Sequence, residues 1–97
     1  MVSNKRYTRQ HYMDLYTMGK KPVIVTYREV RENVLEFYFE QVKGTNFRYL
    51  RIEQDGVLVE NSGFSVSEIS FLRSFIKNNI RSIWKEYMEV VENADSI

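Results

Sequence analysis

The sequence contains no cysteine, only one proline (Pro22) and only one histidine (His11). The lack of cysteine excludes disulfides, thiolate zinc sites and cysteine nucleophiles. A single histidine without cysteine gives no transition-metal spacing, so we expect no metal and interpret His11 as an incidental surface residue. No run approaches the roughly 20 apolar residues of a membrane helix, and the first residues lack a signal peptide's apolar stretch. We expect a cytoplasmic protein that does not contact a membrane.

Glycine is also scarce, with four residues in the chain. None of them builds a glycine-rich loop ahead of a helix, which excludes phosphate-binding loops of the Walker and Rossmann types. We therefore expect no nucleotide and no other cofactor.

The composition favours one folded domain over residues 1–97. The chain is 43% hydrophobic and 14% aromatic, which is enough for a packed core and is not typical of disorder. The formal net charge is +1, but residues 1–31 hold seven Lys and Arg against two acids. We interpret residues 1–21 as a basic, exposed N-terminal segment.

The sequence predicts an α+β fold in the order α-β-β-β-β-α. A short N-terminal helix over residues 9–18 is indicated by the helical spacing of Tyr12, Leu15 and Tyr16. Residues 22–62 should form a four-stranded antiparallel meander, because apolar and polar residues alternate and turn residues separate the runs. A long C-terminal helix over residues 65–92 should pack on this sheet, with Ser65 and Glu68 forming its capping box.

Three turn placements predict one register for the sheet. They set Tyr27 opposite Phe37, Phe37 opposite Ile52, and Ile52 opposite Val59 across a two-residue Asp55-Gly56 turn. The same apolar set then shares one face of the sheet: Val23, Val25, Tyr27, Leu35, Phe37, Phe39, Leu50, Ile52, Val57 and Val59.

The predicted helix is longer than the predicted strands. About 27 residues span about 40 Å, whereas an eight-residue strand spans about 26 Å. The last turns should therefore present apolar residues beyond the sheet, and the N-terminal helix, a second copy or a partner should cover them. The candidate partner-binding residues are Trp84, Tyr87, Met88 and Val91.

The other face of the sheet carries four glutamates: Glu36, Glu40, Glu53 and Glu60. Paired carboxylates can act as general acid and base. The predicted register sets Arg28 opposite Glu36, Arg51 opposite Glu60 and Tyr49 opposite Glu40. Such pairs are ordinary cross-strand stabilisation, and an open face offers no cleft that would shift a pKa. We therefore expect a protein that is not an enzyme, with catalysis on these glutamates as the least favoured alternative.

Aromatic and basic side chains suggest a further alternative. Exposed tyrosines and arginines on a sheet can stack single-stranded bases, and a cationic helix strip can contact phosphates. The candidate nucleic-acid residues are Tyr38, Tyr49, Arg51, Arg73, Lys77, Arg81 and Lys85. Because the interspersed glutamates would repel phosphates, the favoured prediction is a small binding or adaptor module that contacts a protein partner or a second copy of itself.

Overall fold

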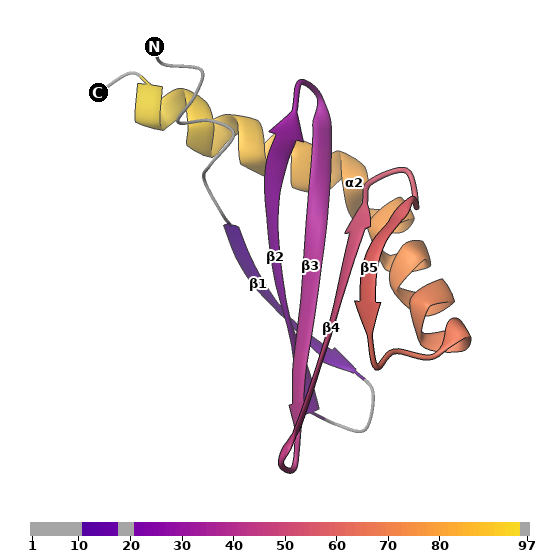
Figure 1. Cartoon of the computed structure of the whole chain (residues 1–97). Helices are drawn as coiled ribbons and strands as arrows, with labels where there is room; N and C mark the ends of the chain where they lie inside the picture. Colours follow the sequence, from indigo (N-terminus) through magenta and orange to yellow (C-terminus); the bar gives the residue numbers. More distant parts are fainter. Residues whose placement is uncertain (1–10, 18–20, 96–97) are drawn as a thin grey trace.

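The computed structural model describes residues 11–17 and 21–95. They form β1 (His11–Thr17), β2 (Lys21–Arg31), β3 (Val34–Lys43), β4 (Asn46–Glu53), β5 (Leu58–Ser62) and the helix α2 (Val66–Asp95) (Figure 1). The strands pair antiparallel with their neighbours in the order β1-β2-β3-β4-β5. The predicted α+β class, the antiparallel meander and the long C-terminal helix are therefore confirmed.

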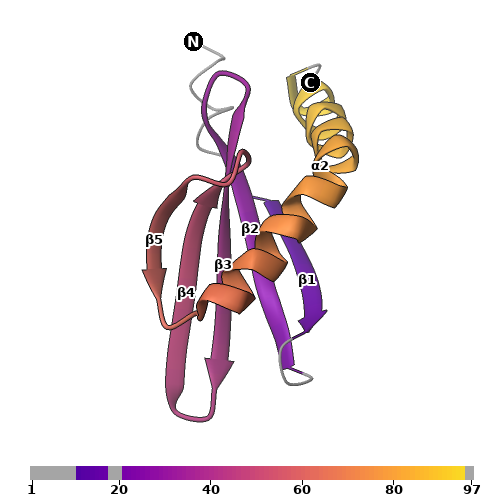
Figure 2. The same ribbon diagram turned by 90° about the vertical axis from the view of Figure 1, so that its right-hand side faces the viewer.

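The helix α2 crosses one face of the sheet obliquely (Figure 2). We call this face the inner face and the opposite one the outer face. The core lies between the inner face and α2, where Phe37, Phe39 and Leu50 are fully buried. All of the predicted inner-face residues except Val57 and Val59 are buried.

The registers of β2 with β3 and of β3 with β4 are as predicted. Tyr27 lies opposite Phe37, and Phe37 lies opposite Ile52. The agreement follows from the strict period of two in a strand, since a slip of one residue would expose every buried side chain.

The predicted register of β5 is wrong, because the turn that precedes this strand is longer than predicted. Gly56 adopts φ +96°, and Glu53 N–H donates to Val57 O at 2.9 Å, so the loop comprises residues 54–56 rather than two residues. Ile52 consequently pairs with Leu58, not Val59, and a bulge then restores the predicted pair of Arg51 with Glu60. Val57 and Val59 are exposed as a result.

Residues 11–17 correct a second prediction, because they form a strand instead of part of a short helix. The rest of the segment predicted as that helix, residues 9–10 and 18, lies outside the described residues. β1 pairs with β2 along seven positions, from His11 opposite Tyr27 to Thr17 opposite Lys21. An isolated helix of this length is marginal, whereas pairing satisfies the backbone groups on the open edge of β2. Leu15 lies opposite Val23 and packs against the core.

The start of α2 is the predicted capping box. Ser65 N–H donates to Glu68 Oε1 at 2.8 Å, and Glu68 N–H donates to Ser65 Oγ at 3.2 Å. The helix continues to Asp95, three residues beyond the predicted end.

Part of the second half of α2 packs on the β2–β3 hairpin, which is longer than the eight-residue strands assumed above. β2 has 11 residues and β3 has 10. Tyr87 packs edge-on against Tyr27 at 6.3 Å between ring centroids, and its hydroxyl donates to Glu29 Oε1 at 3.0 Å. The hairpin therefore covers Tyr87, one of the side chains that we expected to need another cover, while the last turns of α2 extend beyond the strands (Figure 1).

Candidate functional site on the outer face

A transverse row of side chains runs across the outer face. Pairing places Tyr12, Thr26, Tyr38, Arg51 and Glu60 side by side on the five successive strands. Side chains at paired positions share a face, so the row forms one continuous strip opposite α2.

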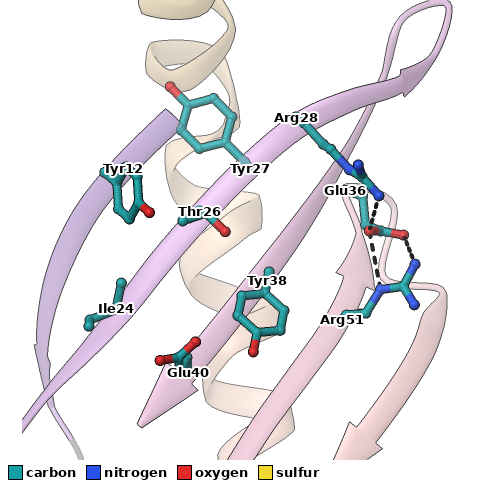
Figure 3. A pocket seen from close by; sticks show the side chains of 9 residues that line it. All are labelled: Tyr12, Ile24, Thr26, Tyr27, Arg28, Glu36, Tyr38, Glu40 and Arg51. Atoms are coloured by element: carbon teal, nitrogen blue, oxygen red, sulfur yellow. Dashed lines mark hydrogen bonds and ion pairs between the residues drawn. The ribbon is translucent and has the colours of Figure 1, made fainter. Parts of the chain in front are cut away.

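A hollow of about 360 Å³ lies on this face, beside the row (Figure 3). Thr26 is small and only 8% exposed, and it stands between the larger residues Tyr12 and Tyr38. The volume is at the low end of the roughly 300–1,000 Å³ of ligand pockets. The residues around the hollow are Tyr12, Ile24, Thr26, Tyr27, Arg28, Glu36, Tyr38, Glu40 and Arg51.

Arg51 organises the charges at one end of the hollow. Its guanidinium contacts Glu36 Oε2 at 3.2 Å and Glu60 Oε1 at 3.2 Å. Arg28 approaches Glu36 from the other side at 4.0 Å. The cross-strand pairs predicted between Arg28 and Glu36 and between Arg51 and Glu60 are therefore present.

Tyr49 departs from its predicted partner. It lies opposite Glu40 in the register, but its hydroxyl donates to Glu60 Oε2. This hydrogen bond, reinforced by Arg51, lowers the pKa of Glu60, and it also raises the pKa of the Tyr49 phenol. Glu60 is therefore held as a carboxylate by two donors.

Three aromatic rings line up along the outer face. Tyr49 lies between Tyr38 and Phe47, with 5.9 Å between ring centroids on each side. Burial, and then a hydrogen bond with Glu40, raise the pKa of Tyr38 to about 12. Tyr38 thus stays neutral at physiological pH and presents an uncharged ring to the hollow.

Glu40 differs from the other glutamates of this face. Glu36 and Glu60 pair with Arg51. Glu53 accepts hydrogen bonds from both terminal nitrogens of Arg31, at 2.9 and 3.1 Å. Within the part of the chain that the structure describes, the side chain of Glu40 interacts only with Tyr38. One carboxylate beside the hollow therefore lacks a cationic partner among these residues.

The nucleic-acid candidates do not share one surface. Tyr38, Tyr49 and Arg51 lie on the outer face, as described above. The cationic helix strip is exposed on α2, which covers the opposite face (Figure 2). Its first member, Arg73, donates to the Gly56 carbonyl at 3.0 Å, and the remaining members are Lys77, Arg81 and Lys85.

The partner-binding candidates belong to the core or pack against it. Tyr87 and Val91 are buried, while Trp84 and Met88 are partly buried. Trp84 packs edge-on against Tyr87 at 5.6 Å, and its Nε1–H donates to Gln54 Oε1 at 3.1 Å. Tyr87 and Val91 are therefore covered within this chain, whereas Trp84 and Met88 keep part of their surface exposed, and their contact with a partner stays a prediction.

Sequence reasoning missed three residues of the hollow: Tyr12, Ile24 and Thr26. Their contribution depends on β1 lying beside β2, and the helical spacing of the N-terminal segment concealed that strand. The signal that was available is Met13-Asp14-Leu15, where polar and apolar residues alternate as in a strand.

The described residues contain no group of three or more metal-ligating side chains. In residues 11–17 and 21–95, no helix has the length and apolar character needed to cross a membrane. Comparison of the chain with protein-family models, with curated proteins and with solved structures gives no match. The site must therefore be interpreted from its own geometry.

Proposed function

We propose that this protein is a small, non-enzymatic binding module that contacts a protein partner through the outer face of its sheet. The observation that carries the proposal is the hollow beside Thr26, on the face that α2 leaves open. The inner face is covered by the helix, so the outer face is the open face of the sheet that remains for a partner.

The chemistry of the outer face is typical of a protein interface. Tyrosine and arginine are enriched at such interfaces, because they bury a large area and still satisfy polar groups. Here Tyr12 and Phe47 are exposed on the same face as the Arg51 network, and the exposed side chains of Ile24 and Val42 add apolar area.

A second candidate is binding of single-stranded nucleic acid, which the aligned rings of Phe47, Tyr49 and Tyr38 favour. The charges of the face oppose it. Four glutamates stand against Arg28, Arg31 and Arg51, and the donors of Arg31 and Arg51 already contact carboxylates. Phosphate contacts dominate nucleic-acid affinity, so this face favours a protein. Catalysis by the glutamates has less support, because arginines engage three of the four.

Site-specific photo-crosslinking in the producing cells tests the proposal. A benzophenone amino acid replaces Phe47 on the outer face or, as the matched control, Phe71, which is exposed on α2. We expect discrete protein adducts from position 47 and few from position 71. The adduct from position 47 should disappear when Ile24→Lys fills the hollow.

The identity of the adduct separates the alternatives. An adduct with the chain itself would identify the partner as a second copy. Nuclease-sensitive adducts from position 47 would replace the proposal by the nucleic-acid candidate. Adducts that form at position 71 and not at position 47 would overturn the proposal.

A further inference from the structure

We propose that the slot between Tyr12 and Tyr38 receives a lysine or arginine side chain of the protein partner, with Glu40 as the counter-ion. This inference rests on the proposed function and specifies the chemistry of the partner. It follows from the shape of the slot, from the charges around it and from the chemistry of its walls.

The shape of the slot admits one extended side chain. Tyr12 on β1 and Tyr38 on β3 lie opposite the same residue of β2, Thr26. Neighbouring strands are roughly 4.8 Å apart, so the two tyrosines stand on strands roughly 10 Å apart. That spacing leaves room for a single aliphatic stem between two rings, above the short threonine side chain (Figure 3).

The charges favour a cation. Glu40 lies at the end of the slot next to Ile24, with which it pairs across β2 and β3. Its carboxylate interacts only with Tyr38 among the described residues, whereas the three other outer-face glutamates each contact an arginine. An incoming ammonium or guanidinium group would therefore pair with the outer-face glutamate that has no arginine partner among the described residues.

The walls of the slot suit the same group. The faces of aromatic rings carry partial negative charge and attract cations within about 6 Å of the ring centroid. Lysine and arginine also carry long apolar stems, which can lie along Ile24 and the methyl group of Thr26. An anion would instead meet Glu40 at one end, and at the other end arginines already occupied by Glu36.

An NMR titration with four peptides tests this inference. The peptides are Ac-Gly-Ser-Xaa-Ser-Gly-NH₂, with Xaa as lysine, arginine, glutamine or glutamate, added to the ¹⁵N-labelled full chain. We expect saturable shifts of the Thr26, Tyr38 and Glu40 amides with the lysine and arginine peptides. The glutamine peptide should bind about fivefold or more weakly, in line with a cation–π contact and one ion pair.

Matched variants locate the effect. Glu40→Gln keeps the size of the side chain and should weaken the lysine peptide about fivefold. Glu89→Gln makes the same change in net charge on an exposed position of α2 and should leave the affinity unchanged. Tyr12→Leu, at a side chain that is 75% exposed, removes one wall with little risk to folding and should also weaken binding.

The outcomes separate this inference from the proposed function. Equal binding of the four peptides at the outer face, unaffected by Glu40→Gln, would overturn the cation slot and leave a protein-binding face. Tighter binding of the glutamate peptide would also overturn it. If no peptide shifts these amides while crosslinking at position 47 still captures a protein, only the inference about the slot is refuted and the proposed function remains. If both fail, the proposed function falls with it.

Discussion

The two faces of the sheet differ in what their side chains do. On β4, Arg48 points to the inner face and Arg51 to the outer face, and both are surrounded by hydrogen-bond acceptors. Arg48 contacts Gln41 and both carboxylate oxygens of Glu68, and its guanidinium lies 4.4 Å from the ring centroid of Phe64. Arg51 contacts Glu36 and Glu60 beside an open hollow. The first network joins the sheet to the start of α2, whereas the second lines a surface.

This difference indicates that the inner face stabilises the fold and that the outer face is available for binding. Polar groups on the inner face are buried, so each lost partner would leave an unsatisfied group in the interior. Most polar groups on the outer face are partly exposed, with Thr26 and Glu36 as the buried exceptions, so a partner can rearrange them at small cost. Stability should therefore depend on the inner face and binding on the outer face.

The largest expected contrast is between two phenylalanines. Phe37 is 0% exposed on the inner face, whereas Phe47 is 52% exposed on the outer face. Phe37→Ala should lower the free energy of unfolding by about 3–5 kcal/mol, because it leaves a cavity in the core. Phe47→Ala should cost less than about 1 kcal/mol, mostly from lost contact with Tyr49. Urea unfolding followed by circular dichroism measures both, and equal losses would contradict this difference between the faces.

The two arginines of β4 give the next contrast. The Arg48 side chain is 15% exposed and that of Arg51 is 35% exposed. Arg48→Ala should cost about 2–3 kcal/mol, since it removes the guanidinium donors from Gln41 Oε1 and from both Glu68 oxygens in a largely buried site. Arg51→Ala should cost about 1 kcal/mol, because its pair with Glu60 is screened by solvent, while Glu36, whose side chain is 9% exposed, keeps Arg28 at 4.0 Å. Urea midpoints that rank Arg51→Ala as the more damaging change would refute this account.

Two glycines compare the effect of an added Cβ at a crowded position with its effect at an open one. A Cβ at Gly63 would lie 2.8 Å from the Arg48 Cβ, whereas a Cβ at Gly44 would have nothing within 4 Å. Both have positive φ, so each alanine variant carries backbone strain of about 1 kcal/mol. Gly63→Ala should cost at least about 1 kcal/mol more than Gly44→Ala because of the added clash. Thermal unfolding of the two variants side by side checks this order.

Glu68 makes the stability of the inner network depend on pH. Burial raises its pKa, but the Ser65 N–H and then Arg48 outweigh burial, so the folded-state pKa lies below the ordinary value. Its contribution is therefore complete above the unfolded-state pKa and is lost as the pH falls through the folded-state pKa. Glu68→Gln should cost about 1 kcal/mol at pH 7, and its stability should fall less between about pH 5 and pH 3. Parallel slopes for the variant and the wild type would contradict this assignment.

The smallest effect on stability is expected at Glu40. It has no ion pair among the described residues, so Glu40→Gln should change the free energy of unfolding by less than about 0.5 kcal/mol. Differential scanning calorimetry of the variant should therefore match the wild type. A large loss of unfolding free energy would show that Glu40 stabilises the fold and is not available to a partner.

Most of the fold could be predicted from the sequence, because alternation in β2, β3 and β4 allows only one register. The predicted length of the turn before β5 was wrong, because Asp55-Gly56 is compatible with both a two-residue and a three-residue loop. The predicted N-terminal helix was wrong, because the spacing of Tyr12, Leu15 and Tyr16 favoured a helix, whereas pairing with the open edge of β2 favours a strand. The hollow could not be predicted for the same reason, since Tyr12 reaches it only from β1.

Filling the hollow tests the central claim most directly. Ile24→Lys places a cation opposite Glu40, and Asn78→Lys adds the same charge at an exposed position of α2. The account predicts that both variants keep their free energy of unfolding within about 0.5 kcal/mol. It also predicts that only Ile24→Lys abolishes the crosslinked adduct from position 47. Undiminished crosslinking in a folded Ile24→Lys variant would show that the hollow is not part of the binding surface.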